Sequence, residues 1–139
     1  MRTLPKSDNS LLLRTDFSDD AAWENLCKAV QQMSEEGFQA RFDFINDREY
    51  DQLTVEQLLT LTPKVNGHTF VCIADRSTLT DPEQPVLVVD LNDTLGRVFR
   101  VIPSEIWGVE NNLSIANMDY YEFADNCDPD GVFRGFPSA

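Results

Sequence analysis

The sequence predicts an α/β protein with one mixed sheet of five or six strands and flanking helices. Runs with the two-residue period of strands alternate with runs that have the three- and four-residue period of helices. Residues 68–74 and 86–91 are almost continuously apolar, which is typical of central strands covered on both faces. Turn residues at 92–96 join the second of these runs to residues 97–102. The first half of the sheet should therefore be largely parallel and the second half an antiparallel hairpin.

The first third of the chain predicts a strand, a helix and a second strand. Residues 10–17 form the first strand, and the polar residues 18–20 supply N-cap chemistry for the helix. Gly37 ends that helix, and residues 38–44 then alternate as in a strand with one buried face. The apolar stripe of the helix is Trp23, Leu26, Cys27, Val30 and Met33.

A second, shorter helix precedes the two central strands. Thr54 and Gln57 have the form of a capping box, in which each side chain bonds the other residue's backbone N–H. Pro63 closes this helix, because proline cannot continue the backbone hydrogen bonds. Residues 75–85, between the central strands, are expected to form a polar loop.

The last third of the chain is less regular. Residues 103–117 should be a mixed segment with a turn of helix and a short strand at 113–116. Residues 118–126, with an acidic first turn, fit a final helix. Residues 128–131, Asp-Pro-Asp-Gly, form a turn.

Length and charge set the broad class of the protein. The 139 residues suffice for one domain, expected over residues 10–136, with a disordered N-terminal tail at 1–9 and a C-terminal tail at 137–139. The formal net charge is −13, which repels phosphate backbones and anionic lipids. Nucleic acids and membranes are therefore poor partners, and a basic protein is a better one.

The compartment follows from apolar run lengths and cysteines. No apolar stretch approaches the roughly 20 residues that cross a bilayer, and no apolar signal segment follows the N-terminus. Cys27, Cys72 and Cys127 cannot all pair within one chain and form no Cys-x-x-Cys motif. We expect a cytoplasmic protein in a reducing compartment.

Aspartates at the ends of the expected strands are the candidate catalytic residues. Carboxylates gathered at one edge of a parallel sheet could hold Mg²⁺ or Ca²⁺ and assist hydrolysis of a phosphoryl or carbonyl group. No Asp-x-Asp pair and no histidine ligand accompanies them, so we expect no tightly bound metal. The catalytic candidates are Asp16, Asp75 and Asp90, with Asp43 and Asp47 at neighbouring strand ends.

Two other patterns resemble known chemistry. His68 and Cys72 would lie about 13 Å apart along a strand, too far for a nucleophile and its base. Residues 126–131 match the first half of a calcium loop, but the twelfth position is Pro137, where a bidentate glutamate is required. A plain turn is the alternative for this loop. No cofactor motif, such as Gly-x-Gly, is present.

An irregular stretch around the second tryptophan is the candidate recognition surface. It places Trp107 beside Glu110, Asn111 and Asn112. Aromatic and amide side chains on irregular segments often make binding surfaces. The alternative is that Trp107 fills the core and the asparagines bond free backbone groups.

Residues 11–23, 86–91 and 102–119 resemble an uncharacterised family of small acidic bacterial proteins, a domain of unknown function. The similarity extends from residue 10 to residue 136. It implies a stand-alone domain whose distinctive patches are residues 15–23 and 107–119, and it implies no activity, cofactor or catalytic residue.

Two hypotheses of function remain. The first is a non-catalytic binding domain whose acidic surface engages a basic protein, for example in an immunity role that neutralises a toxin. The second is a metal-assisted hydrolase or phosphatase that uses the strand-end aspartates. Convergence of three carboxylates at one point would favour the second.

Overall fold

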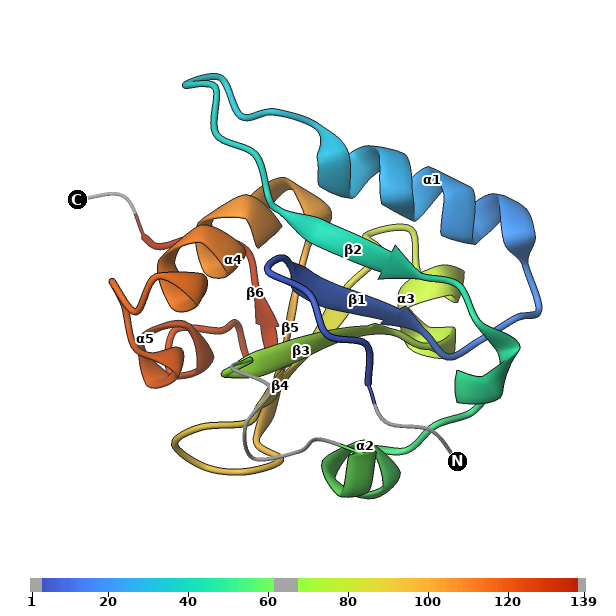
Figure 1. Ribbon diagram of the computed structural model, residues 1–139. Coiled ribbons are helices and arrows are strands. Elements are labelled where there is room, and N and C mark those ends of the chain that lie inside the picture. The colour runs from blue at the N-terminus through green and yellow to red at the C-terminus, as the bar shows by residue number, and fades with distance from the viewer. Residues whose placement is uncertain (1–3, 62–67, 138–139) are drawn as a thin grey trace.

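The computed structural model describes residues 4–61 and 68–137. Within these residues, six strands form one mixed sheet in the order β2-β1-β3-β4-β5-β6 (Figure 1). The strands are β1 (Ser10–Arg14), β2 (Phe42–Ile45), β3 (Phe70–Ala74), β4 (Val86–Asp90), β5 (Val98–Val101) and β6 (Val132–Phe133). The helices are α1 (Asp20–Gln31), α2 (Val55–Leu61), α3 (Arg76–Thr80), α4 (Ile106–Ser114) and α5 (Tyr120–Ala124), with short 3-10 turns η1 (Arg48–Tyr50) and η2 (Pro103–Glu105).

The strand directions confirm the predicted fold class. Strand β1 pairs in parallel with both β2 and β3. Strands β3, β4 and β5 are antiparallel, and β6 adds to β5 in parallel. The parallel first half and the antiparallel β4–β5 hairpin are therefore as expected.

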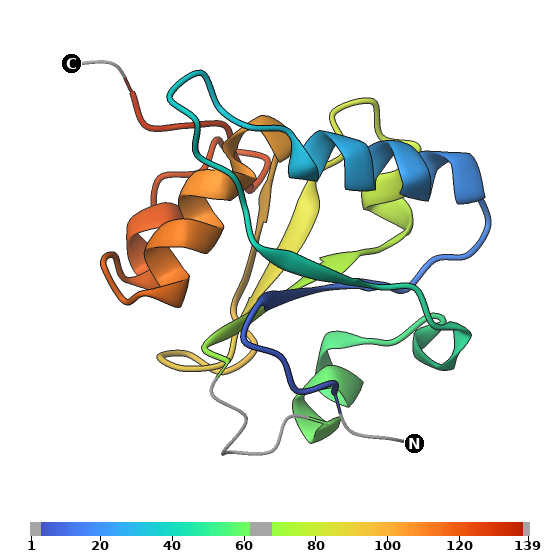
Figure 2. The same ribbon diagram turned by 45° about the horizontal axis from the view of Figure 1, so that its top comes forward.

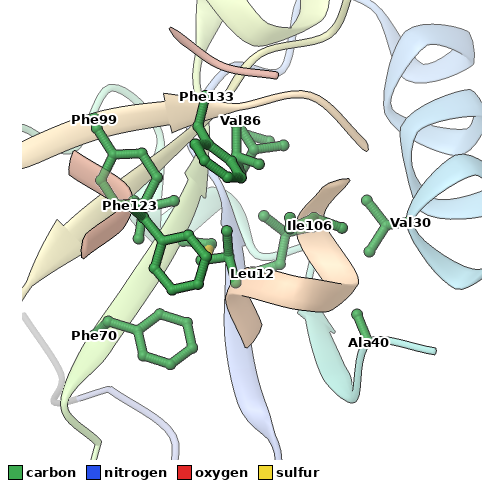
Figure 3. Packing of buried hydrophobic residues seen from close by; sticks show 14 of the residues in the cluster. Leu12, Val30, Ala40, Phe70, Val86, Phe99, Ile106, Phe123 and Phe133 are labelled. Atoms are coloured by element: carbon green, nitrogen blue, oxygen red, sulfur yellow. The ribbon is translucent and has the colours of Figure 1, made fainter. Parts of the chain in front are cut away.

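Helices cover both faces of the sheet. Figure 2 shows α1 above the sheet and α2 below it. On the α1 side, apolar residues of α1, α4 and α5 pack on alternate strand residues (Figure 3). On the α2 side, a smaller cluster joins Tyr50 and Leu58 to the other strand residues. Burial on both faces explains why β3 and β4 are almost continuously apolar.

Helix α1 forms as its stripe predicts but ends earlier. The side chain of Asp19 accepts a hydrogen bond from the Ala22 N–H at the N-cap. The helix ends at Gln31, before Gly37, so Met33 leaves the stripe and is 62% exposed. The expected place of Met33 in the helical stripe is therefore wrong, because the residues between Gln31 and Gly37 are not helical.

Helix α2 begins with the predicted capping box. The Gln57 N–H donates to Thr54 Oγ1 over 3.1 Å, and the Thr54 N–H donates to Gln57 Oε1 over 3.0 Å. Pro63, expected to close the helix, lies outside the described residues.

Two segments expected to be irregular are helical. Residues 75–85 contain α3, because Asp75 and Thr78 make a capping box at its start. Helix α4 replaces the strand expected at residues 113–116, since apolar side chains at Ile106, Val109 and Leu113 face the core. Tertiary packing here outweighs the low helix propensity of the glycine and asparagines between them.

The ends of the domain also differ in detail from expectation. Strand β6, which no pattern predicted, lies beyond the turn at residues 128–131. Leu4 is buried, and its N–H donates to the Leu61 carbonyl, so chain before β1 packs on the α2 side. Residues 1–3 and 138–139 of the expected tails lie outside the described residues.

Val88 tests whether the central strand is as buried as the packing implies. Val88 is 0% exposed on β4, whereas Val98 on β5 is 45% exposed. Val88→Asp should leave the chain insoluble or unfolded, because an unpaired buried carboxylate costs several kcal/mol, roughly the whole stability of a small domain. The matched control Val98→Asp should stay soluble with a melting temperature within a few degrees of wild type, measured by circular dichroism. Equal behaviour of the two variants would contradict this packing.

Candidate binding groove

The strand-end aspartates lie at opposite ends of the strands, so they are divided between the two ends of the sheet. Arg14 pairs with Ala74 in the parallel register of β1 and β3, so Asp16 and Asp75 follow at the same edge. Asp90 pairs with Phe70, at the other end of β3. Five residue steps at ~3.3 Å place Asp90 about 16 Å along the sheet from Asp75. The three catalytic candidates therefore do not converge.

Asp75 and Asp90 each hold their own part of the fold together. Arg100 donates two hydrogen bonds to the Asp75 carboxylate, over 2.9 and 2.8 Å. Burial alone would raise the pKa of Asp75, but the Arg100 pair and the Thr78 cap hold it below its usual value. Asp90, 1% exposed, accepts backbone N–H bonds from residues 92, 93 and 94 and so shapes the turn after β4.

The remaining carboxylates also have local partners. Asp16 accepts from the Ser18 hydroxyl, Asp43 from Asn9, and Asp47 from the Glu49 N–H. Across residues 4–61 and 68–137, no three His, Cys, Asp or Glu side chains are grouped so that they could hold a metal ion.

The loop that resembles a calcium site contains a guanidinium. Arg134 donates to Asp128 over 2.7 Å and to Asp130 over 2.8 and 3.2 Å. The Gly131 N–H donates to the Asp128 carbonyl, as in an ordinary turn. The Arg134 guanidinium thus forms ion pairs with the carboxylates of Asp128 and Asp130.

Cys72 and His68 lie in different settings. Cys72 is 0% exposed in β3, and burial raises the pKa of its thiol well above the usual value. His68 precedes the strand, with Nε2 2.9 Å from the Asn9 carbonyl oxygen. A buried thiol of this kind is not a nucleophile.

The segment proposed for recognition is an anchored helix rather than an irregular loop. Glu110 is 2% exposed and accepts from the Ser10 hydroxyl over 2.8 Å and the Arg41 N–H over 2.7 Å. It therefore joins α4 to β1 and to the chain entering β2. Its carboxylate is buried inside the domain and is not exposed for binding another protein. Asn111 donates to both Glu110 and the Gln39 carbonyl, which strengthens the same junction.

Asn112 closes the C-terminal end of α4. Its side-chain amide donates to the Gly108 carbonyl over 2.7 Å, and its Oδ1 accepts from Asn117 over 2.8 Å. Its backbone carbonyl accepts from residues 117 and 118. Both asparagines thus bond backbone or neighbouring side chains, as the structural alternative for this segment expected.

Trp107 borders an open groove with a volume of about 760 Å³. The groove runs between the C-terminal end of α1 with the residues after it, the loop between α3 and β4, and the approach to α4. Helix α1 contacts both α3 and η2, which brings these distant segments together (Figure 2). We call it the acidic groove. Its described lining includes Met33, Glu35, Glu36, Glu83, Glu105 and Trp107.

Acidic side chains outnumber basic ones around the acidic groove. Four glutamates and no lysine or arginine are among the described residues that line it. Glu83 is held by Arg134 through two hydrogen bonds of 2.9 Å, which lower the pKa of its carboxyl. Glu35 and Glu36 are exposed in the segment after α1.

Glu105 differs from the other glutamates of the groove. No hydrogen bond or ion pair joins its carboxylate to another described residue, and burial raises its pKa. Gly135 lies against it: a Cβ there would be 2.6 Å from Glu105 Oε1, and the φ of +110° also favours glycine. The C-terminal segment therefore removes water from part of Glu105 without giving it a donor.

Trp107, which lines the acidic groove, is one member of an aromatic pair. The rings of Phe38 and Trp107 stack with centroids 5.1 Å apart and planes within 7°. Phe38 is 50% exposed, and Trp107 is half-buried. Stacked rings of this kind hold each other in place, so the indole is a fixed surface.

Of the residues that line the acidic groove, the sequence pattern indicates only Trp107 as a candidate binding residue. Residues 33–38 contain two glutamates between two apolar side chains, which is also what a solvated helix end looks like. Glu105 carries no local signal. The groove forms from three segments that only the tertiary fold brings together.

The chain belongs to the family described as Domain of unknown function (DUF6924), whose model matches residues 9–136. No curated protein matches the chain. In the described residues, no helix is long and apolar enough to cross a membrane.

Glu110 tests how the wall of the groove is held. Glu110→Ala should lower the free energy of unfolding by about 3 kcal/mol, because the buried Ser10 hydroxyl and the part-buried Arg41 N–H lose their acceptor. Glu110→Gln keeps the shape and one acceptor, so its loss should be about 1 kcal/mol. Urea denaturation measures both values. An Ala variant as stable as wild type would show that this junction is not needed.

Proposed function

We propose that this protein is a non-catalytic binding domain whose acidic groove receives a basic segment of a partner protein. One observation carries the proposal: the groove is lined by glutamates without a lysine or arginine among its described lining, next to exposed apolar side chains. Such a surface is complementary to a segment that alternates cationic and apolar residues.

Charge supports this choice of partner. The net charge of −13 gives the whole molecule a negative field, which attracts a basic protein over distance. Three of the four groove glutamates have no bonded cation among the described residues, whereas the carboxylates of Asp75, Asp90 and Glu110 are already bonded. Encounter therefore depends on the net charge, and docking on the groove.

Apolar contact supports it as well. Met33 is 62% exposed at the lining, and Phe38 is 50% exposed behind Trp107. Exposed apolar side chains next to charged ones are typical of protein contact sites. A partner with only charged side chains would leave Met33 and Phe38 exposed to water.

The proposal includes a cytoplasmic location and a bacterial source. All three cysteines are free, which suits a reducing compartment. Neutralising a basic toxin is one role of this class. Metal-assisted hydrolysis is not proposed, since Asp16, Asp75 and Asp90 are separated and locally bonded.

A charge-reversal pair of variants tests the groove. The probe is a synthetic octapeptide in which leucine alternates with lysine and arginine in equal share. Glu35→Lys with Glu36→Lys should weaken its binding by at least about tenfold, because two attractive contacts become repulsive. Asp51→Lys with Glu56→Lys changes the net charge equally near α2, on the opposite face of the sheet, and should weaken it far less.

Calorimetry with the basic peptide and a glutamate–leucine control peptide measures these affinities. The on-rate should also fall with salt, since the Debye length is about 8 Å at physiological ionic strength. Equal losses in the two double variants would mean that only the overall field attracts the peptide. In that case, or if wild type did not bind the basic peptide, the groove proposal would be abandoned.

A further inference from the structure

We infer that Glu105 and Trp107 form a subsite of the acidic groove that selects an arginine side chain of the partner. This inference rests on the proposed function, because it names the side chain that anchors the basic segment. Three observations carry it: a carboxylate to which no described residue donates, an aromatic surface two residues along the chain, and an arginine elsewhere in the same fold that contacts both a carboxylate and aromatic rings.

The first observation is the state of Glu105. Its carboxylate is partly withdrawn from water against Gly135, and no described residue donates to it. Removing water from a carboxylate without replacing the lost hydrogen bonds is unfavourable, which is why burial raises the pKa of Glu105. A cationic donor from outside would restore those bonds and favour the ionised carboxylate.

The second observation is the surface that Trp107 adds. It lines the same groove as Glu105, and its ring stacks on that of Phe38. A flat, weakly hydrated guanidinium packs on aromatic surface more favourably than a compact, strongly hydrated ammonium. A carboxylate with a neighbouring aromatic surface therefore favours arginine over lysine.

The third observation comes from Arg14. Its guanidinium carbon lies 4.5 Å from the Phe17 ring centroid and 5.7 Å from that of Trp23. Its Nη2 lies 2.8 Å from Asp20 Oδ1. This fold thus already accommodates a guanidinium between aromatic rings and a carboxylate.

The neighbouring glutamate shows how the groove differs from that internal site. Glu83 lines the groove but already accepts both hydrogen bonds of the Arg134 fork. Glu105 also carries two carboxylate oxygens, and no described arginine donates to them. Glu105, rather than Glu83, is therefore the groove carboxylate that we expect to accept hydrogen bonds from an arginine of the partner.

The test compares two octapeptides, one alternating arginine with leucine and one alternating lysine with leucine. Wild type should bind the arginine peptide several-fold more tightly. Glu105→Gln should weaken the arginine peptide by about tenfold and remove the preference, because a charge-assisted fork is lost. Trp107→Leu, which keeps an apolar side chain, should also reduce the preference.

A charge-matched control variant separates the preference for arginine over lysine from the general attraction of cationic peptides. Glu36→Gln removes the same charge from the groove, so it should weaken both peptides by a similar factor and leave the preference unchanged. Circular dichroism confirms that each variant is folded. A citrulline–leucine peptide, which has the shape of arginine without its charge, should not bind.

Each outcome separates the two proposals. If wild type binds both peptides equally, or if Glu105→Gln keeps the preference, the arginine subsite is wrong and the groove proposal stands. If Glu36→Gln and Glu105→Gln change the preference alike, the selection does not belong to Glu105, and the subsite is again wrong. If wild type binds neither peptide, both proposals fail.

Discussion

One buried carboxylate fixes the helix on which the groove depends. Glu110 accepts from Ser10, 100 residues earlier in the chain, and from the Arg41 N–H, 69 residues earlier. Helix α4 is thereby held against β1 and the entry to β2, because moving it would separate the buried Glu110 carboxylate from both of these donors. Trp107 lies in the first turn of the same helix, and Glu105 is its N-cap residue. The hydrogen bonds of Glu110 therefore fix the position of the groove wall that contains Glu105 and Trp107.

The acidic residues of this protein divide into two kinds with different consequences. Some, such as Asp75 and Asp90, are bonded to arginine or to backbone N–H groups and define turns and helix starts. Others, such as Glu35, Glu36 and Glu105, have no bonded cation among the described residues and line one groove. The first kind explains why acids end the strands. In the function that we propose, the second kind is the part of the −13 charge that contacts a basic partner.

The sequence reveals those parts of the fold that have strong local periodicity. Strands β3 and β4 are buried on both faces and so are continuously apolar, and α1 carries a repeated stripe behind an aspartate cap. The short helix α3 and the two-residue β6 are below the length at which a period can be seen. Helix α4 is hidden by residues of low propensity, and its stability comes from packing and Glu110. The groove joins three distant segments, so among its residues only Trp107 stood out.

The most direct test of this account is a map of where a basic peptide binds. Backbone amide NMR shifts of the labelled protein, titrated with the octapeptide that alternates leucine with lysine and arginine, report each contacted segment. The account predicts shifts concentrated at residues 32–36, 83–84 and 102–107, which line the acidic groove. It predicts little change at α2, on the opposite face of the sheet. Shifts spread evenly over the acidic surface, or centred on α2, would contradict it.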